Sequence, residues 1–124
     1  MNTGISFTSE QTVSEALTAL AVGSGDLPVL STPMMMALME NAAMLCVAPH
    51  LPEGSTTVGS QIESTHLRPT FLGQVFQATA TLIAVEGRKL TFHLTASDAQ
   101  GVIGEGRHVR YIVDKEKFMK KRVE

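Results

Sequence analysis

The sequence predicts an α+β fold in which an antiparallel sheet wraps around one central apolar helix. Residues 33–48 form a long stretch that is apolar on nearly every side, which is typical of a helix surrounded by protein. The chain after this stretch alternates apolar and polar residues in the manner of strands, at residues 57–67, 75–85, 89–96 and 102–113. A length of 124 residues suits one core and is too short for two, so we expect a single domain over residues 1–124.

The first third of the chain contains the signals for the helices. A short strand is expected at residues 5–8, and the pattern Thr-x-x-Glu at residues 12–15 is a capping box that predicts a helix to about residue 22, ended by Gly23. Thr32 followed by Pro33 predicts the start of the central helix, with Thr32 as its N-cap. That helix should end near residue 47 or 48, before the prolines that follow.

Glycines indicate how the strands turn and pack. Gly87 predicts a tight hairpin, and residues 97–101 a looser one. Gly104 and Gly106 lie two apart in one strand and share a face, so we expect them to let the sheet approach the central helix closely. The tail from Asp114 should form a short exposed helix.

The charges exclude some functions and divide the chain into two halves. All ten Lys and Arg lie from Arg68 onward, so residues 1–67 carry six acids and no base, and the halves carry −6 and +4. This asymmetry suggests that an anionic ligand would be held by the C-terminal half, although solvated strand edges and a basic tail explain it equally well. A net charge of −2 and 5% aromatic residues argue against nucleic-acid binding.

Neither a secretion signal nor a membrane span is visible in the sequence, and we expect no membrane partner. The single cysteine, Cys46, lies inside the apolar helix and is interpreted as a small buried hydrophobe, so the cytoplasm is the expected compartment.

Glu40 is the most informative residue, because it is the one charged side chain of the central helix. Burying a carboxylate there costs several kcal/mol unless a partner compensates it. A structural role at a dimer interface would explain it, but a carboxylate positioned as a base or nucleophile explains it better.

Thr32 and His66 are weaker candidates that gain weight beside Glu40. A hydroxyl at Thr32 would lie at the positive end of the helix dipole, although capping alone explains this residue. His66 falls in a predicted strand. About 12 Å of helical rise separates Thr32 from Glu40, so either an imidazole bridges them or a dimer interface completes the site.

Other chemistries lack their motifs. We find no spacing of metal ligands, no G-x-S-x-G, and no dinucleotide loop around Gly104-x-Gly106, and therefore expect neither metal nor cofactor.

Four short runs occur in one order along the chain: TPMMMALME (32–40), Val58-Gly59 leading to Thr65-His66, VEGRKL (85–90), and IGxGxHxR (103–110) ahead of Glu116-Lys-Phe118. On these residues the sequence from about Thr32 to Phe118 resembles the fluoroacetyl-CoA thioesterase-like branch of the HotDog thioesterases. The resemblance implies a HotDog fold and an acyl-CoA substrate. It further implies a homodimer with active sites at the subunit interface.

The same resemblance implies roles for individual residues. Thr32, Glu40 and His66 would be catalytic, Gly59 would line the acyl pocket beside His66, and Arg110 would lie near the CoA portion. The stretch at residues 26–31 has no aromatic residue, where the fluoroacetyl-specific enzyme is aromatic-rich, which argues against fluoroacetate as the substrate.

The expected reaction is hydrolysis of a small acyl-CoA thioester. Glu40 would act as nucleophile or as general base on water, His66 would transfer the proton, and Thr32 would orient these groups or the carbonyl. Two alternatives use the same fold: a non-catalytic acyl-CoA binding module, and a hydratase or dehydratase that leaves the thioester intact.

Overall fold

The computed structural model describes residues 1–121 of the chain. Its strands are β1 (Ser6–Thr12), β2 (Ser55–Ser64), β3 (Val75–Glu86), β4 (Lys89–Asp98) and β5 (Gly101–Asp114). Its helices are α1 (Ala19–Val22), α2 (Thr32–Val47) and α3 (Lys115–Lys120), with 3-10 turns at Glu15–Leu17 and Ala48–His50. None of these helices is long and apolar enough to cross a membrane.

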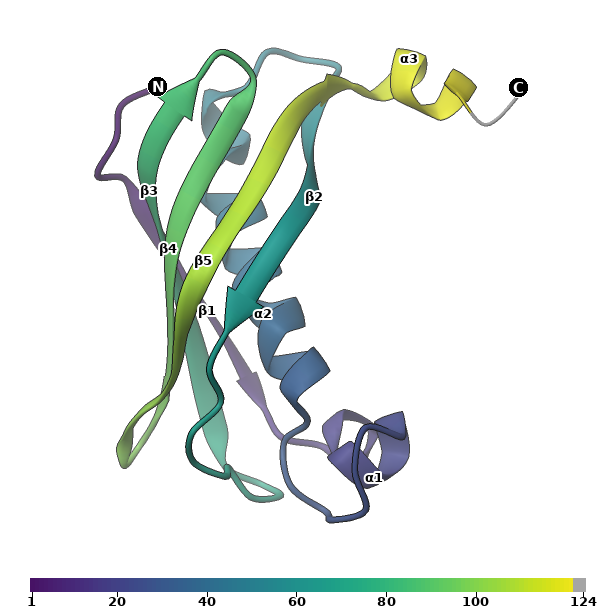
Figure 1. The fold of residues 1–124 in the computed structure, drawn as a ribbon, viewed down its shortest axis with the longest axis vertical. Helices are drawn as coiled ribbons and strands as arrows, with labels where there is room; N and C mark the ends of the chain where they lie inside the picture. Colours follow the sequence, from purple (N-terminus) through teal and green to yellow (C-terminus); the bar gives the residue numbers. More distant parts are fainter. Residues whose placement is uncertain (122–124) are drawn as a thin grey trace.

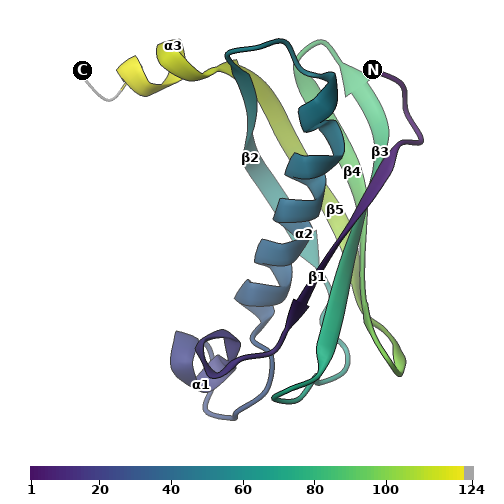
Figure 2. The same ribbon diagram turned by 180° about the vertical axis from the view of Figure 1, so that it is seen from behind.

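One antiparallel sheet in the order β1-β3-β4-β5-β2 curls around α2 (Figure 1). The view from behind shows α2 lying in the concave side of the sheet, with β1 and β2 at its two flanks (Figure 2). The prediction of a sheet wrapped around one central helix is therefore confirmed.

Alternation along the strands builds the core. Strands β3 and β4 each turn every second side chain inward and bury it completely or almost so: Phe76, Ala78, Ala80 and Leu82 on β3, and Leu90, Phe92, Leu94 and Ala96 on β4. They belong to one cluster with Met35, Met39, Ala42 and Ala43 of α2. Burying a large apolar side chain contributes about 1.5–3 kcal/mol, so this cluster holds the helix against the sheet.

Cys46 belongs to the same cluster, as its position in the apolar helix predicted. Burial raises the pKa of its thiol, which keeps the group protonated at neutral pH.

The predicted helix over residues 12–22 is wrong in its extent. Thr12 is the last residue of β1, and the helical part consists of the 3-10 turn and the short α1. Thr18 separates them in extended conformation, because it forms an antiparallel bridge with Leu30. The hydroxyl of Thr18, and not that of Thr12, caps the following helix by accepting the Ala21 N–H. Gly23 ends α1 at φ 88°, as predicted.

The two hairpins of the central strands are both tight. Gly87, at φ 64°, sits in the turn between Glu86 and Lys89, as predicted. The second turn is tighter than expected, because Asp98 pairs with Gly101 and only two residues lie between them. The register shifts between Ala96 and Ser97, just before this turn.

The two glycines of β5 share one kind of neighbour and differ in another. A Cβ on Gly104 would clash with the backbone oxygen of Thr65 and would also lie 3.0 Å from Met35 Sδ, so the predicted close approach of helix and sheet is confirmed at this position. A Cβ on Gly106 would clash with the backbone of Glu63 on β2. The prediction is wrong for Gly106, where the close contact is between neighbouring strands.

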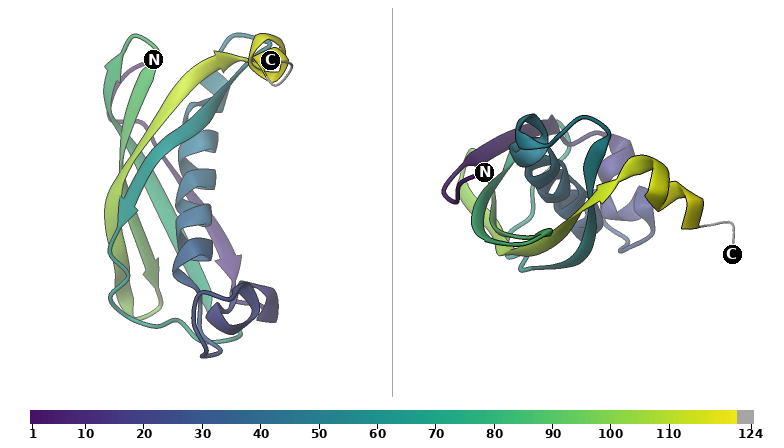
Figure 3. Two further views of the ribbon diagram at one scale, coloured as in Figure 1. Left: turned by 45° about the vertical axis from the view of Figure 1, so that its right-hand side comes forward. Right: turned by 90° about the horizontal axis from the view of Figure 1, so that it is seen from above.

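One side of α2 is not covered by the sheet. The helix buries the face that contacts β1, β3 and β4, and leaves a stripe of exposed residues at Pro33, Ala37, Asn41 and Leu45. Figure 3 shows this open side of the helix beside β2. Within residues 1–121, β2 pairs only with β5, so its outer edge is also free.

Candidate functional site

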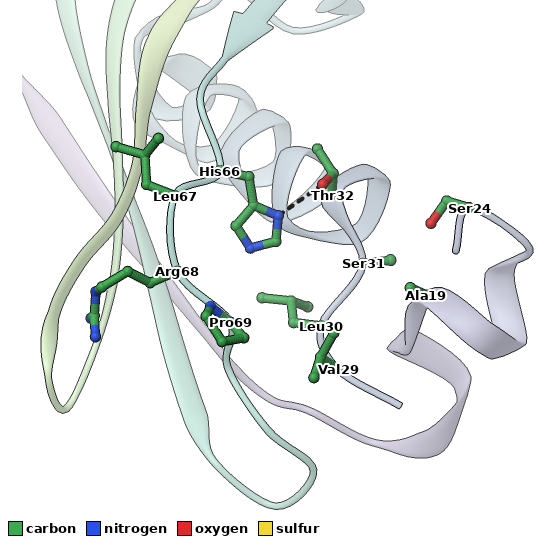
Figure 4. Close-up of a pocket in the computed structure, with 10 residues that line it drawn as sticks. All are labelled: Ala19, Ser24, Val29, Leu30, Ser31, Thr32, His66, Leu67, Arg68 and Pro69. Atoms are coloured by element: carbon green, nitrogen blue, oxygen red, sulfur yellow. Dashed lines mark hydrogen bonds between the residues drawn. The ribbon is translucent and has the colours of Figure 1, made fainter. Parts of the chain in front are cut away.

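Thr32 and His66 meet at the start of α2. The N-cap of this helix is Ser31, whose hydroxyl accepts the Met34 N–H at 3.3 Å, and Thr32 is the first helical residue. The prediction that Thr32 caps the helix is therefore wrong by one position. Because its hydroxyl is not needed as the cap, Thr32 Oγ1 is free to hydrogen-bond His66 Nδ1 at 2.8 Å (Figure 4).

His66 follows the end of β2 in an extended segment that the sheet fixes. Its neighbours donate backbone hydrogen bonds to β5, Thr65 N–H to Glu105 O at 2.9 Å and Leu67 N–H to Ile103 O at 2.7 Å. The ring is half-buried, and burial lowers the pKa of His66, so the neutral imidazole is favoured at pH 7.

The second ring nitrogen of His66 is shielded from solvent and has no hydrogen-bond partner among residues 1–121. A buried polar atom without a partner is unusual and marks a place where another group can bind. If Thr32 donates to Nδ1, then Nε2 carries the proton; if Nδ1 donates, Nε2 is a free base.

A cavity of about 270 Å³ opens in front of the Thr32–His66 pair. Figure 4 shows its walls: Val29 and Leu30 before the helix, Pro69 after His66, and Ala19 from α1. Arg68 also lines this cavity, but its side chain turns away from the pair and binds Asp98 at 3.1 Å. The space next to the imidazole is therefore small, and polar side chains such as Ser24 and Ser31 line it together with the apolar ones.

Glu40 lies two turns further along α2, beside Gly59 of β2. The carboxylate is half-buried, and its Oε2 lies 3.0 Å from the place that a Cβ on Gly59 would take. Any side chain at this position would push against the carboxylate. Gly59 thus provides the room that Glu40 occupies, next to the open edge of the sheet.

A buried cationic cluster faces Glu40 from β5. The guanidinium of Arg110 donates to Thr57 Oγ1 at 2.8 Å, to Thr57 O at 2.9 Å and to His108 Nε2 at 3.1 Å. His108 in turn donates from Nδ1 to Gln61 O at 2.7 Å. These bonds fix the guanidinium in a single orientation, with only 6% of Arg110 exposed.

Burial lowers the pKa of both cluster residues. For His108, burial outweighs the hydrogen bond to Gln61, which raises the pKa, and the positive charge of Arg110 lowers the pKa further, so the neutral imidazole is favoured. The carboxylate of Glu40 acts in the opposite direction and raises the pKa of both His108 and Arg110. Glu40 and Arg110 therefore attract each other, although no ion pair shorter than 4.0 Å joins them in the described residues.

The structure brings the predicted residues together in two groups. Thr32 and His66 form one pair, and Glu40, Gly59 and Arg110 form the other. Within residues 1–121 no hydrogen bond or ion pair links Glu40 to the first pair, so an imidazole bridge between Thr32 and Glu40 is not formed inside one chain.

His108 and Thr57 were not predicted as site residues. A signal for His108 was present, because residues two apart on a strand share a face, and His108 stands two before Arg110. Thr57 could not be found this way, since its contact depends on the pairing of β2 with β5.

The chain is similar to known proteins over most of its length. Residues 13–116 match the family FlK, described as fluoroacetyl-CoA-specific thioesterase. The fluoroacetyl-CoA thioesterase of Streptantibioticus cattleyicolor is 39% identical over 90 residues, which cover 73% of this chain and 65% of that protein.

Solved structures give the same result. A mutant of the fluoroacetyl-CoA thioesterase FlK in complex with acetyl-CoA superposes with a TM-score of 0.92 at 32% identity, covering 98% of this chain and 96% of that one. A hot-dog-like protein from Thermanaerovibrio acidaminovorans has a TM-score of 0.88 at 27% identity, covering 99% and 90% of the two chains. The predicted HotDog fold is confirmed.

Proposed function

Because the chain belongs to the fluoroacetyl-CoA-specific thioesterase family, we propose that it hydrolyses a small acyl-CoA thioester to the free acid and coenzyme A. The observation that carries the proposal is the hydrogen bond between Thr32 and His66 beside a cavity, with a lone carboxylate two turns along the same helix. The acyl-CoA class is supported by the relative that was solved with acetyl-CoA.

Three side chains divide the chemistry in this proposal. Glu40 attacks the thioester carbonyl or takes a proton from the attacking water, since a carboxylate can do either. His66 transfers a proton to the leaving thiolate, and its neutral, half-buried ring suits that role. Thr32 holds the ring in place through Nδ1.

We further propose that the site is completed by a second copy of the chain. In one chain Glu40 and His66 belong to separate groups, while the edge of β2 and the stripe on α2 are both open. An open strand edge and an exposed stripe on the central helix both favour pairing with another subunit. Such a homodimer would bring groups from both copies to one interface.

Gly59 and Arg110 have distinct places in the proposal. Gly59 lies at the carboxylate of Glu40, which fits a residue that lines the acyl pocket. Arg110 was expected near the CoA portion, yet its guanidinium is buried and held by Thr57 and His108. It is better placed to act on the acyl group or on Glu40 than on surface phosphates.

The proposal also includes a single domain and a cytoplasmic location. The described residues share one hydrophobic core, which supports a single domain over residues 1–124. A cytoplasmic location rests on the single cysteine in the sequence.

The two alternatives differ in what happens to the thioester. A binding module would retain acyl-CoA unchanged and would not need a carboxylate at position 40, and a hydratase would alter the acyl chain while the thioester persists. A short acyl group is supported by the relative that was solved with acetyl-CoA.

A panel of acyl-CoA esters of increasing length, with release of free thiol as the readout, tests the function. We expect turnover to be highest for a short chain and fluoroacetyl-CoA not to be the best substrate. Binding of acyl-CoA without thiol release by the wild-type protein would contradict hydrolysis and favour the binding module.

A further inference from the structure

A second cavity lies at the other end of α2 from His66. It opens between α3, the start of β2 and the hairpin that joins β3 to β4, and has a volume of about 550 Å³. Figure 1 shows these three segments together at the top of the molecule, and the start of α2 at the bottom. We call this cavity the basic cleft, after the three cations that line it: Arg88, Lys117 and Lys121.

The backbone around the basic cleft is fixed on both sides. Arg88 O accepts the Ile112 N–H at 2.9 Å, which ties the hairpin to β5, and Gly54 O accepts the Lys115 N–H at 3.0 Å, which ties α3 to the loop before β2. Asp114 caps α3 by accepting the Lys117 N–H at 3.0 Å. The three cations therefore project from anchored segments.

The charges in the basic cleft are not balanced. Among the described residues that line the cleft, Asp114 is the one carboxylate, and it is engaged as the helix cap. In the part of the chain that the structure describes, no ion pair within 4.0 Å holds Arg88, Lys117 or Lys121. By contrast, Lys120 on the same helix pairs with Glu116 at 3.4 Å. A cavity with three cations and one carboxylate favours an anionic ligand with several charges.

The basic cleft also has an apolar side, formed by Ile112, Val113 and Phe118. The Phe118 ring is 37% exposed, and the Lys121 ammonium lies 5.7 Å from its centroid. An exposed aromatic ring beside cations is the arrangement on which nucleotide bases stack while cations contact the phosphates. The cleft thus combines the two properties that a phosphorylated nucleotide requires.

The basic cleft lies far from the Thr32–His66 pair of its own chain. Within one chain, the 16 residues of α2 place it about 24 Å from the Thr32–His66 pair. If two copies pair antiparallel through β2, the start of one β2 comes near the end of the other. The basic cleft, which includes Ser55, would then lie beside the segment that carries the other copy's His66.

We propose that the basic cleft binds the phosphorylated nucleotide end of the acyl-CoA substrate, with the cations on phosphate oxygens and Phe118 beside the adenine. This inference rests on the proposed function for the identity of the ligand. It assigns CoA recognition to residues that differ from the buried Arg110.

The test uses the double variant Lys117→Ala/Lys121→Ala in the full chain. Adenosine 3′,5′-bisphosphate, which carries the nucleotide but no thioester, is titrated by calorimetry. We expect the double variant to bind it about tenfold more weakly or worse, because two charge-assisted contacts are lost. Adenosine without phosphates should bind far more weakly than the bisphosphate to the wild-type protein. The KM for acyl-CoA should rise by a similar factor, and much more than the KM for the matching N-acetylcysteamine ester.

The matched control is Lys115→Ala/Lys120→Ala, which removes two charges from the same helix outside the cleft. Equal weakening by both double variants would overturn the proposal, since it would show an effect of net charge alone. Unchanged binding in Lys117→Ala/Lys121→Ala would overturn it as well. If the bisphosphate binds through Lys117 and Lys121 but no acyl-CoA is hydrolysed, the basic cleft stands and the proposed function fails.

Discussion

At the scale of single residues, Glu40 and Arg110 are opposite charges that attract each other within the candidate site. Both charges are partly or fully withdrawn from water, which costs free energy for each of them. Their mutual attraction offsets part of this cost, and the bonds to Thr57 and His108 hold the guanidinium so that it cannot turn away. The carboxylate therefore stands in a fixed positive field.

The substitution Glu40→Gln tests whether the carboxylate itself is needed. Gln fills the same space but cannot attack a thioester or accept a proton from water, so we expect turnover to fall by about a hundredfold or more. Folding should be nearly unchanged, which thermal unfolding will check. A folded Glu40→Gln variant that releases thiol at close to the wild-type rate would leave Glu40 with a structural role only.

The lowered pKa of His66 predicts the acid side of the pH profile. Burial makes protonation harder, so the neutral ring persists below the ordinary value of 6.5 and is lost only as the pH falls further. If the neutral ring is the active form, kcat/KM should remain high at pH 6.5 and decline with a midpoint below it. A decline centred above pH 6.5 that also persists in His66→Gln would exclude this assignment.

Some residues of the candidate site could be predicted from the sequence more easily than others. Glu40 was conspicuous, because a lone charge in an apolar helix violates the usual pattern. Thr32 and His66 became candidates only when they were considered together with Glu40. Their hydrogen bond joins positions 34 residues apart, which no local pattern reveals. The burial of Arg110 also depends on strand pairing, which the sequence does not show. The prediction that placed Arg110 near the CoA portion therefore did not include its burial.

At the scale of helices and strands, two adjacent residues at the start of α2 have different roles, one in capping the helix and the other in bonding His66. Ser31 is buried, has extended backbone angles and caps the helix, while Thr32 is exposed and bonds His66. Thr-Pro is a good start signal for a helix, but it does not tell whether the cap is Thr or the Ser before it, since both residues serve as caps.

This division predicts opposite effects of two neighbouring substitutions. Ser31→Ala removes the cap and should lower the free energy of unfolding by about 0.5–2 kcal/mol, with the kcat of the folded protein little changed. Thr32→Val keeps the cap but removes the bond to His66, so kcat should fall while stability changes less. Chemical denaturation and thiol release, measured on both variants, check the prediction. It fails if Thr32→Val loses stability and Ser31→Ala loses kcat.

The strands were predicted more closely than the N-terminal helix. Each observed end of β2 to β5 lies within three residues of the predicted one, because alternating burial on a sheet with one inner face shows directly in the sequence. The capping box at residues 12–15 was a local signal only. The bridge between Thr18 and Leu30 interrupts the helix, and such a tertiary contact is not visible in the segment itself.

At the scale of the whole molecule, the single chain leaves features that a partner would satisfy. The edge of β2 is unpaired within residues 1–121, and α2 exposes Ala37 and Leu45. The sequence indicated this as well, since α2 is more uniformly apolar than one curled sheet can cover. What the sequence could not indicate is which edge pairs, and therefore which parts of two chains meet.

Pairing through β2 makes a prediction that only mixed dimers can test. In a hybrid, one chain carries His66→Ala with an intact basic cleft, and the other carries Lys117→Ala/Lys121→Ala with an intact His66. If the basic cleft serves the site of the opposite chain, the hybrid contains one site with both an active imidazole and a working cleft. Its KM for acyl-CoA should then return to the wild-type value at about half the wild-type turnover.

The parent proteins provide the comparison. The His66→Ala homodimer should turn over slowly, and the Lys117→Ala/Lys121→Ala homodimer should show a KM raised about tenfold or more, as two lost charge-assisted contacts imply. If the cleft serves its own chain instead, the only intact His66 in the hybrid lies beside a defective cleft, and the KM stays high. Differently tagged chains, coexpressed and purified over both tags, isolate the hybrid for this measurement. A chain that light scattering shows to be a stable monomer would exclude the shared site altogether, because no second copy would then be present to complete it.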